Sequence, residues 1–270
     1  MGCCSSTALN PDLSGVNRPS NIVRLSYDSD PVLLKNTEDV MTASFAGTTK
    51  TAPEGSLAWT FDPDATKTMV DGDFSKPLLE DPSPERTAHM RFVIKFSLDI
   101  SLKHNSAFAL VEEDEYGKPT TNVLAATCLV PPNNKNLHDP GICEMFSIVY
   151  RINKPPSSFM SQRMDAVGAI MKKGHQKWAS DPHWYVFCFA ANHEKQGKGY
   201  GRTLMEFICS LGDASNLNLY LETHGPRNRR FYERNGYAVM EQMPIEGGKN
   251  KDNPFSMHGG GLAMLRTPKV

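Results

Sequence analysis

Long hydrophobic runs and an excess of charge of one sign are both missing from this chain of 270 residues. No apolar run approaches the roughly 18 residues that a membrane-spanning helix needs, and no signal-peptide pattern opens the sequence. The 29 basic and 30 acidic residues leave a formal net charge of −1, without the basic excess typical of nucleic-acid binding. We therefore expect a cytoplasmic protein that does not bind nucleic acid.

Cysteine is scarce as well, with 6 residues in the whole chain. Four of them are widely spaced: Cys128, Cys143, Cys188 and Cys209. This spacing matches neither a zinc site nor a disulfide framework, so we expect reduced thiols and no metal. A catalytic role for Cys188 is disfavoured, because it lies in an apolar run and buried thiols are usually inert.

Glycine, in contrast, is concentrated at one point. Residues 196–201, Gln-Gly-Lys-Gly-Tyr-Gly, join a strand-like run at 184–190 to a helical pattern that starts at Arg202. Three glycines in five positions allow a sharp turn whose amides can approach a ligand. The helix N-terminus adds unpaired N–H groups and a partial positive charge, so the turn is predicted to hold a pyrophosphate.

The spacing decides between two known phosphate-binding motifs. A Walker loop is excluded, because Lys198 is followed by Gly199 where that motif needs Ser or Thr. The dinucleotide fingerprint fits Gly197 and Gly199, and Glu222 stands where its ribose-binding acid would lie. Its third glycine, however, falls at Arg202. The dinucleotide fold is therefore disfavoured.

A second cluster follows the turn. Residues 217–222 read as a strand, and residues 227–235 read as a short helix closed by Asn-Gly. The series Gln-x-x-Gly-x-Gly, helix, strand ending in Leu-Glu-Thr, and Pro-Arg-Asn-x-x-Phe-Tyr-Glu-Arg-x-Gly-Tyr resembles the GNAT superfamily of acyl-CoA-dependent N-acetyltransferases, with most likeness to puromycin N-acetyltransferase and its relatives. The detailed resemblance covers residues 184 to about 243, and a looser one begins at about residue 22.

The resemblance implies an α/β (α+β) fold over a single domain, residues 21–270. In this GNAT fold a central mixed, mostly antiparallel sheet is flanked by helices, and a splayed strand pair holds acyl-CoA. It also implies acetyl-CoA as co-substrate. The residues it assigns to the pyrophosphate are Gln196, Gly197, Lys198, Gly199, Tyr200, Gly201 and Arg202.

The same resemblance assigns residues to the rest of the co-substrate. Asn228 would contact the pantetheine arm, and Tyr232 would lie near the sulfur as general acid. An amide of the strand at 185–191 would polarise the acetyl carbonyl. The basic run Arg227, Arg229 and Arg230 either meets the 3′-phosphate of CoA or is a solvated helix start.

The chemistry of acetyl transfer needs a neutral amine and a proton for the departing sulfur. Tyrosine has a pKa near 10 and a thiol one near 8.5, so full proton transfer from Tyr232 would be uphill and a hydrogen bond to the sulfur is expected instead. The alternative is that Tyr232 simply packs the helix on the sheet. Glu222, His193 and His224 are the candidates for the base that takes the proton of the amine. Glu222 has the alternative role of holding Arg227 in place.

The extreme N-terminus carries a separate signal. Gly2 and Ser6 fit the N-myristoylation pattern, and Cys3 and Cys4 are placed for palmitate. A single myristoyl chain binds membranes only marginally, so stable anchoring requires a second acyl chain. The pattern predicts a disordered tail over residues 1–20 that anchors the protein to the cytoplasmic face of a membrane. The alternative is an unmodified tail.

Residues 131–182 form an insertion that, in the GNAT fold, borders the acceptor site. Its helix at 158–178 places Phe159, Met160, Met164 and Trp178 either in a substrate pocket or on the buried face of the helix. Residues 47–84 are expected to be mostly loop. Periodicity predicts the other elements: strands at 21–25, 107–112, 122–130 and 261–266, and helices at 32–45 and 84–104.

Two functions are compatible with these patterns. The first is acetyl transfer from acetyl-CoA directly to a primary amine of a small molecule or peptide. The second is a catalytically silent acyl-CoA-binding or scaffold protein tethered to a membrane. The presence of Tyr232 and Asn228 favours the enzyme, and no pattern in the sequence specifies the acceptor.

Overall fold

A seven-stranded sheet of order β1-β2-β3-β4-β5-β7-β6 forms the centre of the computed structural model, which describes residues 16–47, 81–132, 158–245 and 257–269. Every neighbouring pair of strands is antiparallel except β4 and β5, which are parallel. The predicted mixed, mostly antiparallel sheet is thus confirmed. The strands are β1 Ile22–Leu25, β2 Ala107–Glu113, β3 Pro119–Val130, β4 His183–Ala191, β5 Asn218–Thr223, β6 Ala238–Ile245 and β7 Met257–Arg266.

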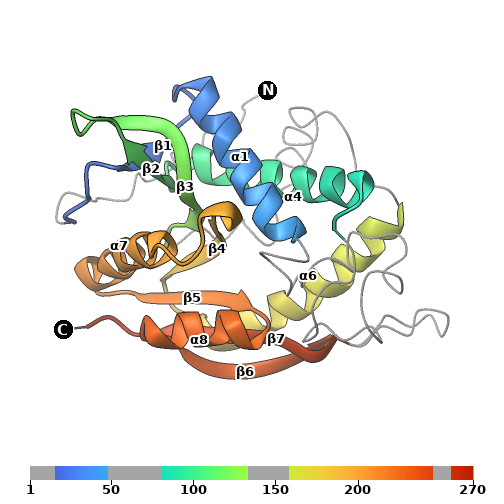
Figure 1. Ribbon diagram of the computed structural model, residues 1–270. Helices are drawn as coiled ribbons and strands as arrows, with labels where there is room; N and C mark the ends of the chain where they lie inside the picture. The colour runs from blue at the N-terminus through green and yellow to red at the C-terminus, as the bar shows by residue number, and fades with distance from the viewer. Residues whose placement is uncertain (1–15, 48–80, 133–157, 246–256, 270) are drawn as a thin grey trace, which may run out of the picture.

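Helices cover both faces of the sheet (Figure 1). One face carries α7 (Tyr200–Ser215) and α8 (Pro226–Arg234), which pack on alternate strand residues such as Leu219 and Leu221. The opposite face carries α1 (Pro31–Ala46), α4 (Pro84–Lys103) and α6 (Ser158–Trp178). The alternation of a strand therefore sends Tyr220 toward α6 and its neighbours toward α7.

Two of these helices start at the same kind of signal. Asp30 accepts a hydrogen bond from the Val32 amide (2.7 Å), and Ser83 accepts one from the Arg86 amide (3.0 Å). In each case a proline follows the capping residue at the first helical position, where its missing N–H is not needed. The predicted starts of both helices are accordingly correct to within one residue.

The strands β4 and β5 separate soon after they meet. Their parallel ladder joins only His183, Trp184 and Tyr185 to residues 218–220. Beyond Tyr185 each strand pairs only on its outer side, β4 with β3 and β5 with β7. The splayed strand pair implied by the family resemblance is therefore present.

A β-bulge lies in β4 just past the point of separation. Cys128 of β3 pairs with Cys188, while the next residue, Leu129, pairs with Val186, so Phe187 is an extra residue on β4. Bulges redirect side chains and are frequent beside active sites. Tyr185 of β4 pairs with Tyr220 of β5 at the end of the ladder. Phe187 and Glu222 each lie two residues beyond this pair, so they stand at the same level of the opening.

Most elements expected from periodicity are observed, with ends shifted by a few residues; the final strand starts four residues earlier, at Met257. The strand β6 was not predicted, and neither was the 3₁₀ turn η2 (His193–Lys195). The N-terminal residues Gly2, Cys3 and Cys4 lie outside the described residues, as do Cys143 and most of the expected loop at 47–84. Within the described ranges, no helix is both long and apolar enough to span a membrane.

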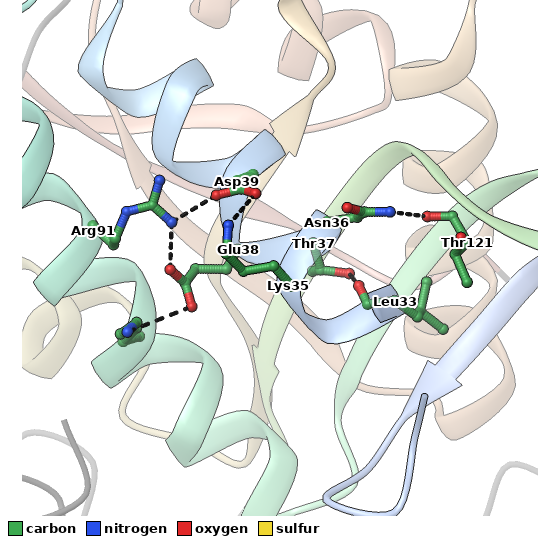
Figure 2. Close-up of polar contacts among 9 residues, drawn as sticks. Leu33, Lys35, Asn36, Thr37, Glu38, Asp39, Arg91 and Thr121 are labelled. Atoms are coloured by element: carbon green, nitrogen blue, oxygen red, sulfur yellow. Dashed lines mark hydrogen bonds and ion pairs between the residues drawn. The ribbon is translucent and has the colours of Figure 1, made fainter. Parts of the chain in front are cut away.

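A group of charged residues lies between α1 and α4 and joins the two helices (Figure 2). The Arg91 guanidinium of α4 donates to Glu38 (2.5 Å) and to Asp39 (2.6 Å) of α1. Lys35 also pairs with Asp39. Burial alone would raise the pKa of Asp39, but the hydrogen bonds from Lys35 and Arg91 hold it below its ordinary value. At the other edge of α1, Asn36 donates to the Thr121 carbonyl of β3 (2.8 Å).

We expect Arg91→Ala to lower the free energy of unfolding by about 1 kcal/mol at pH 7, since a one-third-exposed ion pair is partly screened by solvent. Because the folded-state pKa of Asp39 is depressed, this stabilisation is present at neutral pH and is lost as the pH falls below about 4. Urea unfolding at pH 7 and pH 3 measures both values. An equal loss at the two pH values would contradict the electrostatic explanation.

Candidate functional site

The predicted phosphate-binding turn connects β4 to α7. Gly197 and Gly199 both have positive φ, 82° and 84°, and nothing lies within 4 Å of the position that a Cβ would take at either. Backbone conformation, not crowding, therefore requires glycine at both positions. Gly199 is the N-cap of α7 and no side chain caps this helix, so the N–H groups of its first turn are available to a ligand.

The third glycine of the turn serves packing. A Cβ at Gly201 would lie 3.5 Å from the Ala191 Cβ and 3.8 Å from the Phe189 ring, so α7 starts close against β4. Asn192 fixes the other end of the turn, because its amide donates to the Leu124 carbonyl (2.8 Å) and its side chain caps η2. The turn is thus held at both ends while its centre is exposed.

The helix α8 bridges the opening between the two splayed strands. It follows β5 in the chain, yet Phe231 stacks on Phe189 of β4, with 5.7 Å between ring centroids. At its N-terminus Arg227 donates to the Gln196 side chain (2.5 Å) and so connects α8 to the turn. Asn228 lies half-buried in the first turn of the same helix. The two predicted motifs, distant in sequence, therefore meet.

Tyr232 is buried on the α8 side of the opening. Its ring contacts Phe189 of β4 (6.4 Å between centroids) and Tyr237 (5.6 Å), and the residue is 8% exposed. Burial, with a smaller effect of the Cys188 thiol, raises the pKa of Tyr232 above its ordinary value. The phenol consequently stays protonated at physiological pH, which suits a hydrogen-bond donor better than a full proton donor.

Glu222 lies on the opposite face of the sheet from Tyr232, on the splayed part of β5. Its side chain is 4% exposed, and burial raises its pKa to about 7. The hydroxyls of Tyr185 and Tyr220 are near enough to lower this pKa, but less than burial raises it. Neither carboxylate oxygen makes a hydrogen bond of good geometry with the described residues. A carboxylate with a pKa near 7 is suited to act as a general base.

A group of aromatic rings surrounds this carboxylate. The His175 ring of α6 lies 4.7 Å from the His183 ring, 4.7 Å from Tyr185 and 4.8 Å from Tyr220. Its Nδ1 atom lies 3.9 Å from the Glu222 Oε1 atom. The helix approaches closely at Gly174, where a Cβ would lie 3.2 Å from the Tyr220 hydroxyl oxygen and collide with Met243.

The other predicted site residues take less specific positions. Lys198 is exposed, Tyr200 is half-buried at the start of α7, and the exposed Arg202 pairs with Glu206 (2.8 Å). Arg229 pairs with Glu233 (2.8 Å) and Arg230 is exposed, so a contact of this run with a phosphate stays a prediction.

The two histidines proposed as alternative bases lie near the ends of the splayed strands. His193 is in η2, beside the phosphate-binding turn, and His224 follows β5. Both are half-buried, and their roles stay predictions. Sequence reasoning overlooked His175, because a single histidine in a helical pattern carries no signal without the strand it faces.

Trp178 and two of the described cysteines, Cys128 and Cys188, lie in or against the core. Trp178 packs against the cluster beneath α6 and donates to Glu241 (2.7 Å), while the side chains of Phe159, Met160 and Met164 lie outside the description. Burial raises the pKa of the Cys188 thiol to about 11, which leaves it protonated and a poor nucleophile. Among the described residues, no group of three His, Cys, Asp or Glu side chains could hold a metal ion.

These features define a class of protein. A splayed parallel strand pair, a glycine turn leading to an uncapped helix and a bridging helix with a buried tyrosine form the GNAT fold. Residues 145–237 match the model of the acetyltransferase (GNAT) family. The chain is also 34% identical over 67 residues to an uncharacterised N-acetyltransferase of Schizosaccharomyces pombe. That match covers 25% of this chain, and only about a quarter, 27%, of the relative's own length.

Solved structures share the fold over nearly the whole chain. The "histone acetyltransferase HPA2 and related acetyltransferase" of Corynebacterium glutamicum is 16% identical, with a TM-score of 0.50 over 94% of this chain and 98% of that one. The arylalkylamine N-acetyltransferase 2 of Aedes aegypti is 12% identical, with a TM-score of 0.52 over 92% of this chain and 100% of that one. Identities this low establish the fold alone.

Proposed function

We propose that this protein transfers the acetyl group of acetyl-CoA directly to a primary amine. The observation that carries the proposal is the arrangement of Tyr232 and Glu222 on opposite faces of the opening between β4 and β5. A thioester lying in that opening would have a hydrogen-bond donor on its sulfur side and a base on its acceptor side. The turn at 196–201 and the N–H groups at the start of α7, which no side chain caps, fit a pyrophosphate.

Each step of the transfer has a residue suited to it. Glu222 takes a proton from the ammonium group, and the nitrogen lone pair then attacks the carbonyl carbon. The carbon–sulfur bond then breaks, the CoA thiolate leaves with a hydrogen bond from Tyr232, and the nitrogen gives up its second proton to form the neutral amide. The carbonyl oxygen needs a hydrogen-bond donor. We assign this role to a backbone N–H near Phe187, where the bulge takes β4 out of the regular ladder. Cys188, with its raised pKa, has no role as nucleophile.

The acceptor is proposed to be compact and to carry a primary amine. The buried negative charge of Glu222 favours an ammonium group, and the rings of Tyr185, Tyr220 and His175 beside it favour contact with cations and aromatic groups. The Aedes aegypti enzyme, by its name, acts on arylalkylamines, which have this chemistry. Likeness to puromycin N-acetyltransferase stays a prediction, as does attachment to a membrane through Gly2, Cys3 and Cys4.

The test is thiol release from acetyl-CoA with a panel of amines: tyramine, agmatine, spermidine and a peptide with a free amino terminus. We expect turnover of at least one amine. Tight binding of acetyl-CoA by calorimetry without turnover of any amine would instead support a silent acyl-CoA-binding protein.

Tyr232→Phe is expected to lower kcat about tenfold and to leave the Kd of acetyl-CoA within twofold. The reason is that one hydrogen bond to the departing sulfur contributes roughly 1.4 kcal/mol, which is tenfold in rate. Tyr237→Phe is the matched control, because its buried hydroxyl donates, within the described part of the chain, to the weak acceptor Met205 Sδ (3.8 Å). Equal activity of the two variants would exclude a role for the Tyr232 hydroxyl.

A further inference from the structure

The acceptor side of the site holds more proton-accepting chemistry than one carboxylate. Glu222 is 4% exposed and lacks a well-formed hydrogen bond among the described residues. A buried carboxylate with no hydrogen bond of good geometry loses its hydration without full compensation, so its presence here requires an explanation. In the proposed function the ammonium group of the acceptor is the partner of the Glu222 carboxylate. That role does not explain why His175 lies beside the same carboxylate.

The proton balance of the proposed reaction explains the second group. An acceptor amine arrives as R–NH3+ and leaves as an amide with a single N–H, so its nitrogen loses two protons. One compensates the thiolate that leaves CoA, and the other goes to solvent. A carboxylate holds only one proton at a time. A buried base that must accept a proton before the attack and another after it therefore needs an outlet.

His175 is placed to be that outlet. Its Nδ1 atom lies 3.9 Å from the Glu222 Oε1 atom, and its side chain is 12% exposed, more than that of Glu222. Its ring lies 4.7 Å from the ring of His183, which is half-buried at the start of β4 and contacts the Asp181 carbonyl through Nδ1 (2.7 Å). Glu222, His175 and His183 thus follow one another from the core toward the surface.

Resting on the proposed function, we propose that His175 relays the acceptor's protons from Glu222 toward solvent, so that the two residues act as one proton-accepting pair. Glu222 touches the amine and is the base, while His175 acts through Glu222. The pair joins β5 to α6, the helix of the insertion, which gives that helix a role in the chemistry besides its packing on β6 and β7.

Other titratable groups face the pair and set its surroundings. Tyr185 and His183 come from β4, Tyr220 comes from β5, and Glu241 lies on β6, the edge strand beyond β7. Burial raises the pKa of Tyr185 and Tyr220 and lowers that of His183, so all three are neutral near pH 7. Glu241 is paired with Lys177 (2.9 Å). These neighbours therefore do not compete with Glu222 for protons near neutral pH.

The test is the pH profile of kcat for the full chain with His175→Asn, using acetyl-CoA and the best amine of the panel. Asparagine keeps a polar group near the position of Nδ1 but does not titrate. We expect kcat to fall about tenfold, with both KM values within twofold of wild type. The acid limb should shift, because Glu222 then titrates without the neighbouring imidazole. His89→Asn, in α4, is the control expected to change neither.

Chemical rescue separates proton transfer from packing. Imidazole added to His175→Ala should restore at least part of kcat, in proportion to the fraction of unprotonated imidazole. Wild-type kcat and pH profile in His175→Asn would overturn the relay and leave the proposed function intact. The relay would also be overturned if kcat fell, imidazole did not restore it, and the acid limb did not move. A wild-type protein that binds acetyl-CoA but acetylates no amine would instead overturn the proposed function, and the relay with it.

Discussion

Glu222→Gln is expected to lower kcat for amine acetylation by about 10²- to 10³-fold, within the range of a lost general base. Glutamine preserves the size and polarity of the side chain but cannot accept the proton. In the wild type, kcat should rise with pH through about 7 as the buried carboxylate loses its proton. That acid limb should be absent from the variant.

The free energy of unfolding should not fall in Glu222→Gln as kcat does. Burial raises the folded-state pKa of Glu222 to about 7, above its unfolded value near 4.3, so the folded state binds the proton more tightly. The resulting stabilisation is present at low pH and is lost as the pH rises through about 7. Glu222→Gln cannot lose it and should be at least as stable as wild type at pH 8, which thermal unfolding measures.

The matched control is Glu113→Gln, an exposed carboxylate of β2 that accepts a hydrogen bond from Ser20 (2.7 Å). It should retain wild-type kcat and the acid limb. If Glu222→Gln also kept the wild-type kcat and acid limb, another group, such as His193 or His224, would be the base.

Local sequence predicted the parts of the site that local chemistry determines. The turn at 196–201 needs two positive φ angles and a helix start, and three glycines in five positions are sufficient to indicate both. The starts of α1 and α4 follow from Asp-Pro and Ser-Pro in the same way. Short-range rules suffice in these places, because every interacting group lies within a few residues.

The parts that depend on distant segments were not predictable. His175 and Glu222 are 47 positions apart in the sequence, and only the packing of α6 on the sheet brings His175 Nδ1 to 3.9 Å from Glu222 Oε1. The raised pKa of Glu222 has the same origin, since an acid at a strand end reads as solvent-exposed until α6 is placed over it. The bulge at Phe187 depends likewise on the register with β3.

The missed strand β6 has a different cause. Its sequence, Ala-Val-Met-Glu-Gln-Met-Pro-Ile, lacks regular alternation and contains Pro244, which argues against a central strand. The strand lies at the edge of the sheet and pairs only with β7, with two register shifts. An edge strand tolerates a proline because one of its sides forms no ladder, so Pro244 is compatible with β6.

Gly199→Ala is expected to raise the Kd of acetyl-CoA about ten- to thirtyfold. Gly199 has φ 84° and ψ −1°, and an alanine there costs roughly 1–2 kcal/mol in the left-handed region. The turn would relieve this strain by rotating the peptides whose N–H groups face the phosphates. Space has no part in the effect, because nothing lies within 4 Å of the added Cβ. Isothermal titration with acetyl-CoA measures the change.

Gly168→Ala separates backbone strain from the mere addition of a methyl group. Gly168 lies in α6, also with nothing within 4 Å of an added Cβ, but without a positive φ. The same substitution there should leave the Kd unchanged and stabilise the fold by up to about 1 kcal/mol. Gly199→Asn should weaken binding less than Gly199→Ala, since asparagine tolerates the left-handed region. If all three variants bound acetyl-CoA with wild-type affinity, the conformation of Gly199 would not position the amides, and the turn would lose its assigned role.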